Sequence, residues 1–159
     1  MTASARLAQL GVSLPTVPAP AAAYQPYRRS GPYVYTAGQL PLVDGELTAT
    51  GLVGDDLSTD EAATAAEVAG LNVLAAAAAG AGGIDHVRMV KLTVFVAAPA
   101  GFTEAHLVAN GASGIVAKVL GDNLGAHARS AVAVASLPLG APVEVEAIVE
   151  VVEDATTNV

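Results

Sequence analysis

Arg129 stands out in this sequence because a charged residue there opens an otherwise apolar run, Arg129–Leu137. In a strand, every second residue lies on the same face, so Arg129 would share its face with Ala131, Ala133 and Ala135. These side chains are too small to cover a guanidinium. The pattern therefore indicates open space above Arg129, where an acidic group could bind.

Two carboxylates lie in the last apolar run of the chain, Val143–Val152. Glu144 and Glu146 are two residues apart, which places them on one face of the expected strand. If this strand pairs with the strand of Arg129, an arginine and one or two carboxylates meet on one side of the sheet. The same spacing is typical of an ordinary ion pair at a sheet edge, and both interpretations stay open at this point.

Tyr27 and Gly38 are further candidates for the same place. Tyr27 follows Pro26 and could project its phenol from the N-terminal segment, while Gly38 would let the backbone approach a ligand closely. The alternatives are a tyrosine that packs on the surface and a glycine that marks a strand end or bulge.

The composition limits the kinds of protein that the sequence can encode. Of 159 residues, 7 are Lys or Arg and 15 are Asp or Glu, so charged residues make up 14% of the chain against about 25% in ordinary domains. The length predicts one domain with a sizeable core. So few charges are too few to cover the surface of a monomer, which indicates that part of the surface is buried against other subunits.

Several functional classes are disfavoured by the same counts. A net charge of -8 argues against a nucleic-acid partner, because phosphate binding depends on clustered cations. There are no cysteines, and the three histidines lack ligand spacing, so we expect no metal site. No long apolar stretch typical of a membrane span and no signal peptide is evident, so we expect a cytoplasmic protein that does not bind membranes.

The expected elements form an α+β plan. An irregular arm covers residues 1–19, a single domain covers 20–153, and a short tail covers 154–159. A hairpin-type turn at Asp44-Gly45 joins two extended runs, and the capping box Ser58–Glu61 starts a long alanine-rich helix that ends at Gly80–Gly83. A strand at 86–97, a helix within 104–120 and two strands at 129–137 and 143–152 follow. We expect a mixed sheet with two helices on one face.

Three runs of the sequence resemble one known family. PAAAYQPYRRSG and YVYTAGQLP near the start, VKLTVFV in the middle, and ARSAVAVASLPLGAPVEVEAIVEV at the end are similar to the RidA family (YjgF/YER057c/UK114) and occur in that family's order. The resemblance covers residues 20–152. The last run is the most specific, with its arginine, hydrophobic strand, Leu-Pro, turn and Glu-x-Glu-Ala.

The resemblance implies a chorismate-mutase-like fold, a homotrimer, and three sites in the clefts between subunits. It also implies hydrolysis of reactive 2-imino or enamine acids to 2-oxo acids and ammonia, with no cofactor or metal. Arg129 would bind the substrate carboxylate and Glu144 would orient or deprotonate a water molecule, while Tyr27 and Gly38 would line the pocket. The alternative is a non-catalytic member of the family that binds a small carboxylate metabolite or acts as a regulator.

The sequence departs from the family's common pattern at several positions. Ala37 and Ala131 stand where a serine and a cysteine are common, which removes a hydroxyl and a thiol. The segment 101–127 lacks the usual Phe-x-x-x-Asn pattern, and Asn110 is displaced from the expected position. Pocket size and the substrate side chain are therefore left open.

Overall fold

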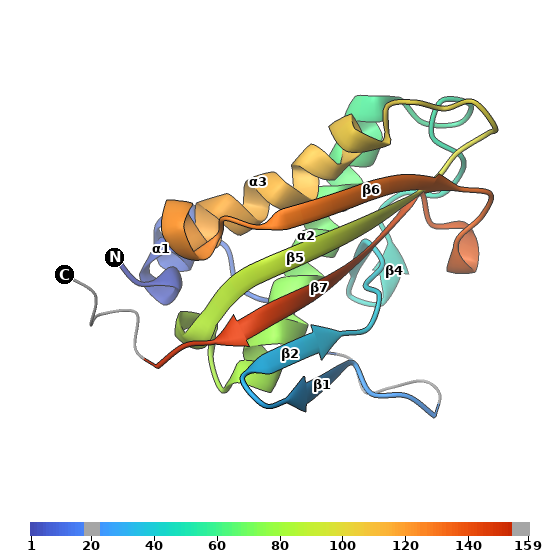
Figure 1. Ribbon diagram of the computed structural model, residues 1–159. Helices are drawn as coiled ribbons and strands as arrows, with labels where there is room; N and C mark the ends of the chain where they lie inside the picture. Colours follow the sequence, from blue (N-terminus) through green and yellow to red (C-terminus); the bar gives the residue numbers. More distant parts are fainter. Residues whose placement is uncertain (18–22, 154–159) are drawn as a thin grey trace.

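The protein folds into a five-stranded mixed sheet with helices on one face. The computed structural model describes residues 1–17 and 23–153; the ends of the predicted arm, at 18–19, and the predicted tail, at 154–159, lie outside the described residues. The strand order is β1-β2-β7-β5-β6, in which β5 and β6 are parallel and the other pairs are antiparallel. Figure 1 shows α2 and α3 side by side behind this sheet. The predicted α+β class and mixed sheet are confirmed.

The elements follow the chain in a simple order. The strands of the main sheet are β1 (Tyr27–Ser30), β2 (Tyr33–Thr36), β5 (Val87–Ala97), β6 (Ala128–Val134) and β7 (Val143–Val151). The two short strands β3 (Leu42–Val43) and β4 (Glu46–Leu47) form a separate hairpin. The helices are α1 (Ala3–Leu10), α2 (Thr59–Ala81) and α3 (Ala105–Leu124), with short 3-10 turns at Ile84–His86 and Pro138–Gly140.

Helix α2 is the central helix of the core. It begins at the predicted capping box, in which the Glu61 backbone N–H donates to the Ser58 hydroxyl and the Glu61 carboxylate accepts from the Ser58 backbone N–H. It ends at Gly82, whose φ of 88° favours glycine. By length and composition α2 could cross a membrane, but its buried residues, mostly alanines, pack against the sheet and α3.

Small residues let α2 and α3 pack closely. Gly111 of α3 lies directly on the Ala63 carbonyl of α2, so a Cβ at position 111 would overlap that oxygen. At Gly70 of α2, a Cβ would lie 3.2 Å from the Ala112 Cα of α3. In the sequence Gly111 only weakens the expected helix; in the fold it is required by the approach of the two backbones.

The sheet has one covered and one open face. Along β7, Val143, Val145, Ala147 and Val149 are buried under the helices, and the alternate residues are partly exposed. The open face carries apolar side chains that no helix covers, among them Tyr33, Tyr35, Phe95, Val132 and Ile148. Tyr35 and Val132 are each 45% exposed. This face therefore exposes several large apolar side chains, beside polar ones such as Lys91 and Glu146, without a covering layer in the single chain.

The N-terminal region differs from the expected irregular arm, because Ala3–Leu10 forms helix α1. The Thr2 side chain caps the helix, and Ser4 donates to the Asp85 carboxylate from its backbone N–H (2.8 Å) and its hydroxyl (2.6 Å). Partial burial disfavours the charged form of Asp85, but the hydrogen bonds from Ser4 outweigh it and lower its pKa. Leu7 is buried in the core. These tertiary contacts stabilise a helix too short to form alone.

Two α3 glycines give a matched test of the helix packing. We expect Gly111→Ala to lower the free energy of unfolding by about 1 to 3 kcal/mol, because α3 must move away from the Ala63 carbonyl. Gly114 has open space around it, so Gly114→Ala should raise stability by up to about 1 kcal/mol through helix propensity. Urea unfolding of the two variants measures both effects. Equal stability of the two would contradict the packing described for Gly111.

Candidate functional site

Arg129 lies at the start of β6 and points toward α3. It pairs with the buried Leu92 of β5, so its side chain is on the helix side of the sheet. Its Nη1 donates to the Asn110 Oδ1 and the Ser113 Oγ, each at 3.0 Å. Its Nη2 donates to the His106 backbone carbonyl at 3.1 Å. The guanidinium is thus held by three oxygens of one helix while remaining partly exposed.

A second layer of hydrogen bonds lies behind Ser113. The Ser113 Oγ is 2.9 Å from the His127 Nε2, and the His127 Nδ1 is 2.6 Å from the Gly125 carbonyl oxygen. His127 belongs to the short loop between α3 and β6. The loop that leads into the strand of Arg129 is therefore connected back to the helix that holds Arg129.

Glu144 lies against Gly38. A Cβ at position 38 would overlap the Glu144 carboxylate, so only glycine leaves room for this side chain. Both segments are fixed by the backbone, because the Gln39 N–H donates to the Val145 carbonyl (2.7 Å) and the Val145 N–H to the Gln39 carbonyl (3.0 Å). This backbone pairing therefore holds Gly38 and Glu144 in contact.

The surroundings of Glu144 favour its protonated form. Partial burial raises the pKa of Glu144 above its usual value, and the charge of Glu146 adds to this effect. Within residues 1–17 and 23–153, the ion pairs are Arg88–Glu150 and Lys118–Glu67. Neither Glu144 nor Glu146 is thus paired with a cation of its own described chain.

Tyr27 lies away from this carboxylate. It is the first residue of β1, where the sequence analysis expects a side chain that projects from the arm. Its ring packs on α2, since a Cβ at Gly80 would lie 2.8 Å from the Tyr27 Cδ2. In the single chain Tyr27 therefore packs against the core, and its contacts match the alternative of a packing residue.

The two C-terminal strands, β6 and β7, do not pair, so the condition under which Arg129 and the two carboxylates would meet is not fulfilled within one chain. β5 lies between β6 and β7, because a parallel β5–β6 pair and an antiparallel β5–β7 pair share that strand. Arg129 is in register with Ala147, while Glu144 is in register with Val132. From strand spacing and rise, the two Cα atoms are about 14 Å apart. Arg129 is on the helix side and Glu144 on the open side, so one chain does not bring them together.

The sequence analysis missed most of the residues that surround Arg129. Asn110, which the sequence comparison placed away from the site, contacts the guanidinium; Ser113 was not a candidate, and the sequence left open whether His127 reaches the cleft. A usable signal was the i, i+3 spacing of Asn110 and Ser113, which puts two short polar side chains on one helix face. Their contact with Arg129 of β6 depends on how α3 lies on the sheet, which the spacing alone does not give.

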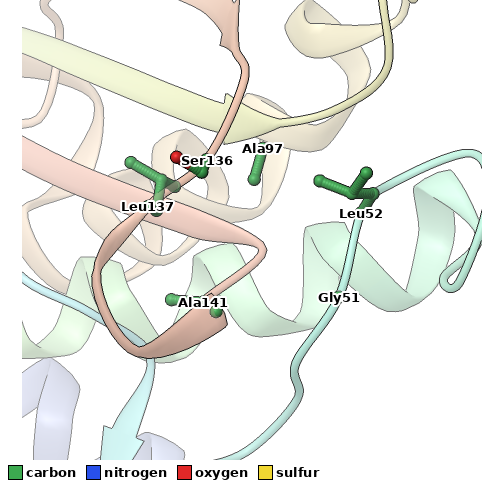
Figure 2. Close-up of a pocket in the computed structure, with 7 residues that line it drawn as sticks. Gly51, Leu52, Ala97, Ser136, Leu137 and Ala141 are labelled. Carbon is green, nitrogen blue, oxygen red and sulfur yellow. The ribbon is translucent and has the colours of Figure 1, made fainter.

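Separate cavities lie elsewhere on the chain. One, of about 190 Å³, is lined by Gly51, Leu52, Ala97, Ser136, Leu137, Gly140 and Ala141. Figure 2 shows the alanine and leucine side chains there, with Ser136 as the only one that carries a polar atom. This cavity lacks an acid, a base and a cation, so it offers no chemistry of its own. In the described part of the chain, no group of three or more acidic or histidine side chains is arranged to hold a metal.

Known proteins resemble the chain over nearly its whole length. The model of the family described as Endoribonuclease L-PSP matches residues 15–151. Protein TCP17 of Trypanosoma cruzi is 45% identical over 148 residues, which is 92% of each chain.

Solved structures agree with this result. The protein Atu1372 of Agrobacterium tumefaciens, described as of unknown function, is 45% identical with a TM-score of 0.84 and covers 94% of each chain. The YjgF gene product of E. coli is 28% identical with a TM-score of 0.60, covering 87% of this chain and 97% of its own. Because the family model matches most of the chain and the similarity extends over the whole fold, the chain belongs to the Endoribonuclease L-PSP family, the family of YjgF and RidA.

Proposed function

We propose that the protein hydrolyses reactive 2-imino acids, and the enamine acids that tautomerise to them, to 2-oxo acids and ammonia. The observation that carries the proposal is that the chain presents a partly exposed guanidinium oriented by α3 and, on the other face of the sheet, a carboxylate of raised pKa. The resemblance to the RidA family, described above, is what implies this reaction. We further propose that the site is shared between the subunits of a homotrimer.

Arg129 is suited to bind the substrate carboxylate. A guanidinium has five N–H donors, and the three hydrogen bonds to α3 leave two that have no partner in the described residues. Parallel N–H donors bind a carboxylate through two hydrogen bonds and so fix its orientation. The imine carbon next to that carboxylate is then held in one place.

Glu144 is suited to act on water. Water adds to the electrophilic carbon of the protonated imine, while Glu144 accepts a proton from the water and a C–O bond forms. Glu144 then returns its proton to the carbinolamine nitrogen, and the C–N bond breaks to release ammonia as the C=O bond forms and the hydroxyl proton passes to solvent, which leaves the 2-oxo acid. The shift brings the pKa of Glu144 closer to neutral pH. A general base that must also return the proton works best when its pKa lies near the working pH.

The positions of the two residues support a shared site. Arg129 and Glu144 lie on opposite faces of the sheet of one chain, so a single ligand contacts both only if the Arg129 of another subunit approaches Glu144. The uncovered apolar face with Tyr35 and Val132 supplies a surface for such a contact. A cation from the neighbour would also compensate the two unpaired carboxylates Glu144 and Glu146.

The family description names an endoribonuclease, but the charge of this chain does not favour RNA. Only five arginines and two lysines oppose fifteen acidic residues, for a net charge of -8. Phosphate backbones bind through several clustered cations. We therefore propose a small carboxylate as the substrate in preference to RNA.

Arg129→Ala tests the carboxylate anchor. We expect wild-type protein to accelerate the loss of 2-iminopropanoate or 2-iminobutanoate generated in situ, and kcat/KM to fall by about 100-fold in Arg129→Ala through loss of a charged, bidentate contact. Arg129→Lys should recover part of it. No acceleration by wild type over buffer contradicts the deaminase proposal, and equal rates for both proteins contradict the anchor. If 2-oxo acids raise the melting temperature without turnover, the protein is a carboxylate-binding module.

Glu144→Gln tests the base. The rate of the wild-type enzyme should fall as the pH is lowered through the raised pKa of Glu144, because the protonated carboxyl cannot accept a proton from water. The variant should lose about 100-fold in kcat and lack this acidic limb. A pH–rate profile of both proteins measures the effect. An acidic limb that persists unchanged in the variant assigns the base to another group.

Mixing of inactive subunits tests the shared site. We expect a particle of three times the 15.7 kDa chain mass in analytical ultracentrifugation. When Arg129→Ala and Glu144→Gln chains are unfolded together and refolded at equal amounts, about a quarter of the sites should combine an intact Arg129 with an intact Glu144. Activity should return to about that fraction. Arg129→Ala mixed with the double variant is the control and should stay inactive; recovery no greater than in this control places both residues in one chain's site.

A further inference from the structure

Ser113 and His127 form a polar pair that the proposed reaction does not use. Ser113 accepts from the Arg129 Nη1 at 3.0 Å and lies 2.9 Å from the His127 Nε2. We propose that Ser113 and His127 are positioning residues, which orient the Arg129 guanidinium for a carboxylate ligand and so set the preference of the site for acids. This inference rests on the proposed function, because it concerns the same anchor.

The chemistry of the contacts assigns the hydrogens. The Gly125 carbonyl oxygen can only accept, so the His127 Nδ1, 2.6 Å away, carries the hydrogen and donates it. In the neutral ring the Nε2 is then an acceptor, and the Ser113 hydroxyl donates to it. With its hydrogen turned toward His127, the Ser113 oxygen presents lone pairs to Arg129. Without His127, the hydroxyl is free to turn its hydrogen toward the guanidinium, where it would oppose the contact.

Both ends of this chain of hydrogen bonds are fixed in the fold. Ser113 is in the middle of α3, and Gly125 is held at its end, where the Gly125 N–H donates to the Gly121 carbonyl at 2.8 Å. A Cβ at Gly125 would lie 2.7 Å from that same oxygen, so the turn is tight. His127 is two residues before Arg129. The pair therefore connects the Arg129 guanidinium to the end of α3 through three successive hydrogen bonds.

The test compares a carboxylate with an uncharged analogue. Isothermal titration calorimetry with 2-oxobutanoate and with 2-oxobutanamide measures how strongly the site prefers the acid. We expect Ser113→Ala and His127→Phe each to weaken 2-oxobutanoate binding by about tenfold, the usual effect of losing a hydrogen bond to a charged group, and to leave amide binding unchanged. A merely structural role would weaken both ligands alike.

Conservative variants and a remote hydroxyl serve as controls. Ser113→Thr keeps the hydroxyl and His127→Gln keeps an acceptor near the Nε2 position, so both should bind 2-oxobutanoate within about threefold of wild type. Thr64→Ala removes an exposed hydroxyl from α2 that bonds only the Asp60 carbonyl, and should change nothing. Equal acid preference in Ser113→Ala, His127→Phe and wild type overturns the inference.

A second measurement does not depend on a ligand. Phenylglyoxal modifies guanidinium groups, and peptide mass spectrometry follows Arg129, with exposed Arg29 as internal reference. Release of Arg129 in Ser113→Ala or His127→Phe should speed its modification several-fold relative to Arg29; unchanged rates overturn the inference. If wild type and Arg129→Ala bind 2-oxobutanoate equally, or neither binds it, the proposed anchor fails while the modification rates still decide whether the pair holds Arg129.

Discussion

The placement of β5 between β6 and β7 is the constraint on which the site depends. The parallel β5–β6 pair requires a crossover, and α3 provides it, so the helix that connects the two strands also covers the residue that opens the second one. Arg129 is consequently turned toward α3 and away from the strand of Glu144. The same topology that builds the sheet places the side chains of Arg129 and Glu144 on opposite faces, so the proposed site requires a second copy of the chain to bring them together.

Small side chains in the helical layer allow a close packing in which short polar groups reach Arg129. Alanine and glycine at the contact of α2 and α3 bring backbones together, as at Gly111 and Ala63. Short polar groups on α3, from Asn110 and Ser113, then reach the guanidinium on the sheet directly. A cation in such surroundings is stable because three oxygens accept hydrogen bonds from it. The open face of the sheet has the opposite character, with exposed tyrosines, an exposed valine and two unpaired carboxylates.

The sequence predicted the long elements well, because each carries a local signal. The capping box at Ser58 and Glu61 marked the start of α2, and the alternation in β5 and β7 marked buried strands. Helix α1 and strand β1 were missed, since α1 depends on Asp85, which is far along the chain, and β1 on pairing with β2. The family resemblance named Gly38 and Glu144 as candidates for one site, but their direct contact is seen only in the structure. The surroundings of Arg129 were not, because strand order and the register of α3 follow from long-range packing that no local pattern encodes.

The position of α1 matters for anyone who attaches a probe to this protein. The helix packs on the far end of α3 and on the turn at Ile84–His86, and Figure 1 shows the amino terminus on that side, away from β1 and β2. An affinity tag or fluorophore joined to Met1 therefore projects from the helical layer, where it leaves the uncovered sheet accessible. The Gly31–Pro32 turn between β1 and β2 lies at the edge of that sheet instead, and a label there would report on whatever approaches it.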